Sequence, residues 1–196
     1  MKNYEKISAA QKLEARDWDL VCARAEGLML EHKPGKEAAV ISSRPPISIN
    51  NRSLGGAAPR PGFGCSESLM LAFQETLGED ILPPEAVAMA GAFRGGLGGA
   101  GCLCGALAAA EMVLGVFFGY YGTASGEQNP DEVKKSRGLY QELHDDFRQA
   151  HGATCCRVLT KKLEAGSAER KANCAALTRS AAFIAGGIIA REAAKG

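Results

Sequence analysis

The chain has 196 residues, of which 46% are hydrophobic and 23% charged, and its formal net charge is +1. This is the balance of an ordinary globular domain that can bury a core without disulfide staples. Basic residues are scattered and aromatic residues make up only 6%, so we expect no nucleic-acid partner.

The first predicted element is a helix over residues 4–31, because apolar residues recur there at the spacing of one helix face. They are Trp18, Val21, Cys22, Ala25, Leu28 and Met29. Residues 42–64 hold four prolines and four glycines with no periodic pattern, which is typical of a linker or arm. We therefore divide the chain into an N-terminal helical extension (1–41), a linker or arm (42–64) and a cysteine-bearing helical domain (65–196).

Helical patterns follow one another through the third segment. We expect helices from Cys65 to a Gly78 cap, from Leu82 to about Phe93, and from Cys102 to about Gly119. Further helices should begin at Asn129-Pro130, at a Thr154 cap before Cys156, and near residue 169. No segment alternates with period two, so the predicted fold is an all-α bundle of about five to six helices with the N-terminal extension.

The apolar stretch 95–121 raises the question of a membrane span. It begins with GGLGGAG and carries one acidic residue, Glu111, in its middle. A charge at that depth of a bilayer is costly, so we expect a buried core helix and no membrane span. We expect Glu111 either to pair with a partner such as Arg94 or to be exposed at the edge of the bundle, because an unpaired buried carboxylate is costly.

The cysteines and the N-terminal segment predict a cytoplasmic protein. Residues 1–20 have no apolar run long enough for a signal peptide. Seven cysteines are an odd number and too few for a disulfide scaffold of this length. In a reducing compartment we expect such thiols to serve metal binding or redox chemistry rather than structural bridges.

Four cysteines stand near the starts of predicted helices, on apolar faces: Cys65, Cys104, Cys156 and Cys174. A free cysteine often acts as a small buried apolar residue. A helix N-terminus, however, stabilises a thiolate, which is the form that attacks disulfides and binds metal. If the helices pack as one bundle, these four thiols can converge, and we take them as the candidate metal ligands. We expect Cys22 to lie apart from them.

The four cysteines occur within GFGCSESLMLAF, GAFRGGLGGAGCLCGALAAAEMVLG, FRQAHGATCCRVL and CAALTRSAAFIA. This pattern resembles the C_GCAxxG_C_C family of small redox-active proteins, which is related to the cysteine-rich domain of split-Soret cytochromes. The resemblance covers about residues 62–192, and Ala109 stands where the CGAxxG motif has glycine. Cys102 and Cys155 are additions beside family positions. The resemblance implies redox activity, with an iron–sulfur cluster held by the four thiolates as one way to carry it.

Four thiolates are the usual complement of an iron–sulfur cluster, and we expect electron transfer through one, with [2Fe–2S] as one form, to an unidentified redox partner protein. Zinc would accept the same ligands. A metal-free thiol–disulfide or sensor protein needs only a dithiol, from Cys102 and Cys104 or from Cys155 and Cys156. Inert cysteines in a structural helical homodimer are a further alternative. Whether the protein is an enzyme stays open.

Residues 96–101 read GLGGAG and satisfy GxGxxG. The segment before them is helical rather than a strand, which disfavours a dinucleotide site. We expect Gly96, Gly98, Gly99 and Gly101 to let the backbone approach a cofactor, with free N–H groups aimed at thiolate or sulfide.

Overall fold

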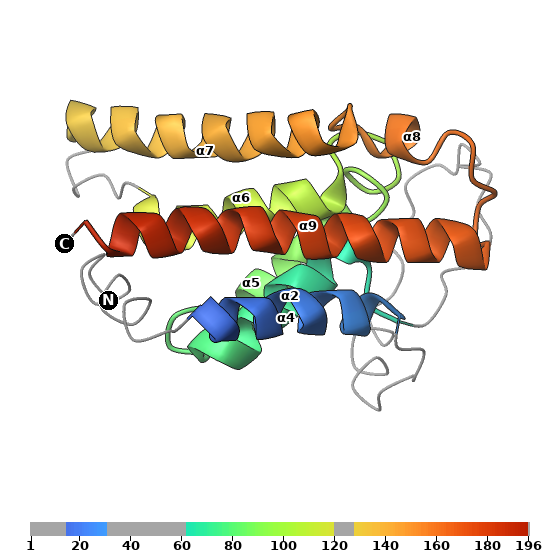
Figure 1. Cartoon of the computed structure of the whole chain (residues 1–196), viewed down its shortest axis with the longest axis horizontal. Coiled ribbons are helices and arrows are strands. Elements are labelled where there is room, and N and C mark those ends of the chain that lie inside the picture. The colour runs from blue at the N-terminus through green and yellow to red at the C-terminus, as the bar shows by residue number, and fades with distance from the viewer. Residues whose placement is uncertain (1–14, 31–61, 120–127, 196) are drawn as a thin grey trace, which may run out of the picture.

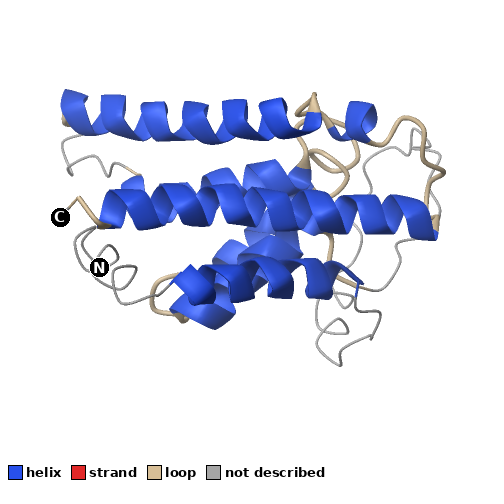
Figure 2. Cartoon of the chain, in the orientation of Figure 1, coloured by secondary structure: helices blue, strands red, loops and turns tan. Residues whose placement is uncertain are grey.

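The structure, a computed structural model, describes residues 15–30, 62–119 and 128–195, and in these ranges it is all-α without strands (Figure 2). The elements are α2 (Ala15–Leu30), α4 (Cys65–Leu77), α5 (Pro84–Ala90), the 3-10 turn η1 (Gly91–Phe93), α6 (Gly105–Phe118), α7 (Pro130–His151), α8 (Cys156–Leu159) and α9 (Ala168–Ala193). The predicted all-α fold is confirmed. The linker at 42–61 and the first residues of the predicted N-terminal helix lie outside the described residues.

The long helices form layers, with α6 and α9 between α7 on one side and α2 and α4 on the other (Figure 1). Small residues let the inner helices approach closely. Ala106, Ala109 and Ala110 of α6 have no exposed surface. At Gly186 of α9, an added Cβ would come within 3.1 Å of the Trp18 ring. Interiors pack to crystal-like density, so these positions have little room for larger side chains.

The N-terminal helix belongs to the same core as the cysteine-bearing helices. α2 contacts both α9 and α4, and its apolar face is buried against them. Cys22 lies in this core, with Arg179 and Asp19 as its charged neighbours. The described part of the extension is therefore a covering helix of the bundle and has no core of its own.

Within the described ranges, α9 is the one helix long and apolar enough to cross a membrane. It runs through the middle of the bundle and packs against α2, α6 and α7 (Figure 1). These contacts cover the apolar face of α9 within the protein. The apolar stretch singled out in the sequence corresponds to α6, which is shorter and largely buried.

Helix ends follow local sequence signals in most places. The Asn129 side chain accepts the Asp131 amide at the start of α7, and Gly152 ends that helix with a φ of 75°. Two predicted starts are wrong. α8 is capped by Cys155 rather than Thr154, and α6 begins at Gly105 rather than Cys102. The reason is tertiary, because the Cys104 amide donates to the Thr154 carbonyl across two loops (2.7 Å).

A carboxylate fixes the start of α4. Glu67 accepts the Gly64 amide (2.6 Å) and the Arg94 guanidinium (2.7 Å). Arg94 also donates to the Gly62 carbonyl (2.6 Å). The predicted pairing of Arg94 with Glu111 is therefore wrong. The Glu67–Arg94 pair ties the segment before Cys65 to the turn that leads into residues 95–101, which we call the glycine loop.

We expect Glu67→Ala to lower the free energy of unfolding by about 1–2 kcal/mol, because it removes a helix cap and a charged hydrogen bond. Glu75→Ala on the same helix is the matched control. Its pair with Arg24 is well exposed on both sides, so its loss should cost less than about 1 kcal/mol. Urea denaturation of both variants measures the difference, and equal losses would contradict the structural role of Glu67.

Candidate functional site

Four free cysteines lie at or near the starts of four helices, at one end of the bundle. Cys65 is the first residue of α4, Cys104 caps α6, and Cys156 is the first residue of α8. Cys174 lies in the second turn of α9. Cys104 and Cys156 are only 4% and 8% exposed, and the other two are partly buried. We call Cys65, Cys104, Cys156 and Cys174 the four-thiol site.

The electrostatics of these sulfurs show that they lie close to one another. Burial, together with smaller contributions from the neighbouring thiols of Cys104 and Cys156, raises the pKa of Cys65 to about 12. Burial likewise raises the pKa of Cys174 to about 11, with contributions from Cys65 and Cys156, while Arg170 acts in the opposite direction.

The helix start at Cys104 does not outweigh its burial. Burial raises the pKa of Cys104 to about 11, although the backbone amides of Leu107 and Ala106 favour the thiolate. The thiols of Cys156 and Cys174 add to the rise. The helix start thus favours the Cys104 thiolate, as expected, but less strongly than burial disfavours it. Like charges cannot gather in a buried site without a compensating cation.

Glycine 105 lets two helices meet at the site. A Cβ added at Gly105 would lie 2.9 Å from the Cys65 sulfur and 2.7 Å from the Phe93 carbonyl oxygen. The sulfur thus rests against the first turn of α6, beside Cys104. The sequence offered a signal in the CGA triplet at residues 104–106, but the need for glycine follows only from the packing of α4 on α6.

A pocket of about 430 Å³ opens onto the site. Three of its four thiols line the pocket, and three basic side chains join them. The lining includes Cys65, Cys156, Cys174, Arg94, Arg170 and Lys171. The N-terminus of α9, at Ser167 and Ala168, also faces it. Positive charge and helix-end amides therefore surround the space beside the sulfurs.

The donor set suits a sulfur-ligated metal group, but not a single ion in this arrangement. No three His, Cys, Asp or Glu side chains in the described part of the chain have the geometry to hold one metal ion. A single zinc ion needs thiolates at about 2.3 Å from one centre. An iron–sulfur cluster distributes its four thiolates over more than one metal centre, two per iron in [2Fe–2S] and one per iron in [4Fe–4S]. Four free thiols beside a pocket of about 430 Å³ supply the number and type of donors that an iron–sulfur cluster needs.

The backbone amides of the glycine loop form hydrogen bonds within the loop and the turn before it. The amides of Gly96, Gly98, Gly99 and Gly101 all donate to carbonyls of residues 92–96. A Cβ on Gly96 would meet the Cys102 nitrogen at 2.6 Å, whereas Gly98 and Gly99 face open space. In the structure these glycines shape a tight connection, since their φ values are positive. Their contact with a cofactor stays a prediction that these hydrogen bonds do not support.

Cys102 and Cys155 are joined by a disulfide, which the sequence did not reveal. Neither predicted dithiol, Cys102 with Cys104 or Cys155 with Cys156, is formed. The expectation of free thiols throughout is wrong for this pair. The bond links residues that are 53 positions apart in the sequence. In the chain-entropy model, such a cross-link stabilises the folded protein by about 4 kcal/mol, because it restricts the unfolded chain.

Two other candidates lie apart from the four-thiol site. Glu111 is half-buried in a pocket with Leu103 and Tyr140, and burial raises its pKa while His144 opposes this. The His151 ring contacts the Ser180 hydroxyl (2.8 Å), and burial lowers its pKa. Neither is placed to bind a metal with the thiols.

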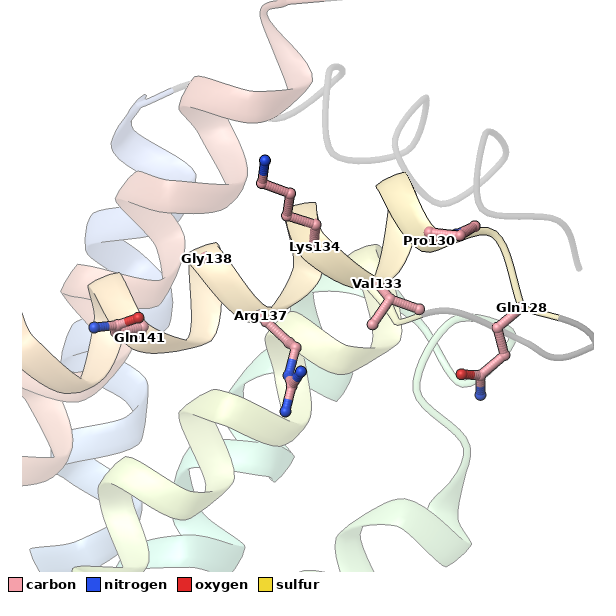
Figure 3. A pocket seen from close by; sticks show the side chains of 7 residues that line it. All are labelled: Gln128, Pro130, Val133, Lys134, Arg137, Gly138 and Gln141. Carbon is pink, nitrogen blue, oxygen red and sulfur yellow. The ribbon is translucent and has the colours of Figure 1, made fainter.

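A hollow of about 650 Å³ lies on α7. It is lined by Gln128, Pro130, Val133, Lys134, Arg137, Gly138 and Gln141 (Figure 3). Lys134 and Arg137 point away from each other there (Figure 3). Since it lies toward the helix end farthest from α8 and its cations do not converge, it has no part in the thiol chemistry.

The raised pKa values predict a loss of stability at alkaline pH. Between pH 9.0, where thiols ordinarily ionise, and about pH 11, the folded metal-free protein holds more protons than the unfolded chain. Stability is therefore full below pH 9 and falls as pH rises, by up to about 1.4 kcal/mol per pH unit for each such thiol. Urea denaturation at several pH values measures this slope. Cys174→Ser should make this slope shallower, because the contribution of one thiol is removed. An unchanged slope would contradict the burial of that thiol.

One family model matches the part of the chain that contains the four-thiol site. The family described as "Putative redox-active protein (C_GCAxxG_C_C)" matches residues 63–188, which include all four thiols of the site. Comparisons with curated proteins and with solved structures found no match. Since the family match covers more than half of the chain, the protein belongs to the C_GCAxxG_C_C family of redox-active proteins.

Proposed function

We propose that the four-thiol site binds an iron–sulfur cluster and that the protein transfers electrons through it. The observation that carries the proposal is the convergence of four thiols next to a pocket of suitable size: the pKa values of Cys65, Cys104 and Cys174 are each raised in part by other thiols of the group. Cys65, Cys104, Cys156 and Cys174 would be the ligands. When bound, such a cluster takes up and releases single electrons.

The chain's own residues prepare this site for negative charge. Burial favours the protonated forms of Cys65, Cys104 and Cys174, so binding iron requires that their protons leave and that the metal supply the compensating charge. Arg170 already favours the Cys174 thiolate, and the Leu107 and Ala106 amides favour that of Cys104. The surrounding burial excludes water, which together with these donors sets the reduction potential of a bound cluster.

The redox partner protein would dock over the pocket. Cys65 and Cys174 are partly exposed in its lining, and Phe63 beside them leaves 47% of its surface exposed. Arg170 and Lys171 line the same opening, which favours a partner with an acidic surface. A cytoplasmic location, where such partners are reduced, fits this proposal.

Reconstitution tests the proposal directly. Protein purified without oxygen and supplied with ferrous iron and sulfide should turn brown and retain iron and sulfide after desalting. Cys104→Ser should lose most of the retained iron, because removing a ligand weakens metal binding by more than the about 10–100-fold that changes to the ligands' hydrogen-bond partners cost. Cys22→Ser is the control and should retain a full complement, since Cys22 lies in the α2–α9 core.

A colourless wild-type sample would contradict the cluster. If two thiols of the four-thiol site were then lost on oxidation, a metal-free dithiol would be the function instead. A colourless sample that binds one zinc ion through the same thiols would establish the zinc alternative. Equal loss of iron from the Cys104 and Cys22 variants would point to general destabilisation.

Gly105→Ala tests the contact that brings Cys65 to α6. The added methyl would collide with the Cys65 sulfur and the Phe93 carbonyl, so we expect a loss of about 1–3 kcal/mol together with a labile cluster. Gly115→Ala on the same helix is the matched control, because its nearest neighbour is the Tyr140 hydroxyl at 3.7 Å. It should gain about 0.5–1 kcal/mol in helix stability. The same sign of change in both variants, measured by urea denaturation, would refute this account of Gly105.

A further inference from the structure

The Cys102–Cys155 disulfide differs in exposure from the thiols beside it. Both bonded cysteines are partly exposed, whereas their chain neighbours Cys104 and Cys156 are buried. The bond joins the loop before α6 to the loop before α8, and the two Cα atoms are 4.3 Å apart. A solvent reagent can therefore reach this pair more readily than it can reach those two buried thiols.

Two backbone hydrogen bonds flank the disulfide. The Cys104 amide donates to the Thr154 carbonyl (2.7 Å), and the Arg157 amide donates to the Gly101 carbonyl (2.9 Å). The Arg157 stem lies along Gly101, with its Cβ 2.9 Å from where a Gly101 Cβ would stand. We call residues 101–104 and 154–157, held by these bonds, the paired loops. They carry two members of the four-thiol site, Cys104 and Cys156.

We propose that Cys102 and Cys155 form a second redox centre, which exchanges with external thiols and disulfides of the glutathione class. We further infer that the disulfide clasps the paired loops and so restricts access to Cys104 and Cys156. The pair shares no sulfur with the four-thiol site, so this inference does not depend on whether that site binds iron.

The exchange balances with an external thiol as the reductant. A thiolate RS⁻ attacks one sulfur of the pair, forms a mixed disulfide and releases the other sulfur as a thiolate. A second external thiol then resolves the mixed disulfide, leaving two protein thiols and one RSSR. Two electrons and two protons are gained by the pair, and the reverse sequence, with RSSR as oxidant, restores the bond.

Neighbouring residues favour an external reagent over an internal one. Cys104 is close in sequence, but it is only 4% exposed, and its backbone is held by the bond from its amide to the Thr154 carbonyl. Arg157 is exposed, and its side chain follows Gly101 as far as Cδ, which brings a cation beside the paired loops. A nearby cation stabilises the thiolate that leaves during exchange.

Redox titration of the full-length protein tests the exchange. The metal-free protein is equilibrated without oxygen in glutathione and dithiothreitol buffers, quenched with an alkylating agent and digested for mass spectrometry. We expect Cys102 and Cys155 to change together from bonded to alkylated in one two-electron transition. In Cys102→Ser, the remaining Cys155 should form a mixed disulfide with glutathione. Cys22→Ser should titrate like the wild type.

Two outcomes would overturn the redox centre. One is a pair that stays bonded in every buffer until urea unfolds the chain. The other is a pair that is fully alkylated in every buffer, oxidising ones included. Because the titration detects the Cys102 and Cys155 peptides themselves, failure of iron reconstitution leaves its result interpretable.

A second measurement tests the clasp. Alkylation rates of Cys104 and Cys156 are compared between the oxidised and reduced forms of the same metal-free wild-type protein. We expect a rise of about tenfold or more on reduction, because opening of the paired loops is then opposed by only two backbone hydrogen bonds. The Cys22 rate should stay unchanged, which excludes global unfolding. Equal rates at Cys104 and Cys156 in the two forms would refute the clasp.

Discussion

The contact between the Cys65 sulfur and Gly105 organises the functional end of this protein. It brings the first turns of α4 and α6 together, so that Cys65 and Cys104 become neighbours although 39 positions separate them in the sequence. Glu67 and Arg94 fix the same helix start from the other side. α8 and α9 then add Cys156 and Cys174 around a junction where a larger residue than glycine has no room.

Burial and charge oppose each other at this junction. Helix starts and nearby cations favour thiolates, but removal from water favours the protonated form more strongly, and the pKa values of Cys65, Cys104 and Cys174 rise accordingly. Without a compensating positive charge, these thiols stay protonated and react slowly. The site suits a group that brings its own positive charge, and this is why the proposed function is cluster binding rather than nucleophilic attack by a free thiol.

The cysteines fall into groups with different surroundings. The four family positions are free thiols gathered at the helix junction, whereas Cys102 and Cys155 are bonded and partly exposed in the paired loops. Cys22 serves the packing of α2 on the bundle. One residue type thus takes distinct chemical roles within a single small domain, because burial and the neighbouring sulfur, rather than the residue itself, decide what a thiol can do.

The sequence by itself determined the helices and the family. Apolar spacing and caps such as Asn129-Pro130 act within a few residues of chain, so the all-α class and most helix ends could be read locally. The four cysteines were likewise recognisable from their motifs. Contacts between distant segments could not be read in this way: Arg94 bonds Glu67 rather than Glu111, and Cys155 caps α8 while it pairs with Cys102. These choices depend on which loops the packed helices bring side by side, and only the tertiary structure decided them.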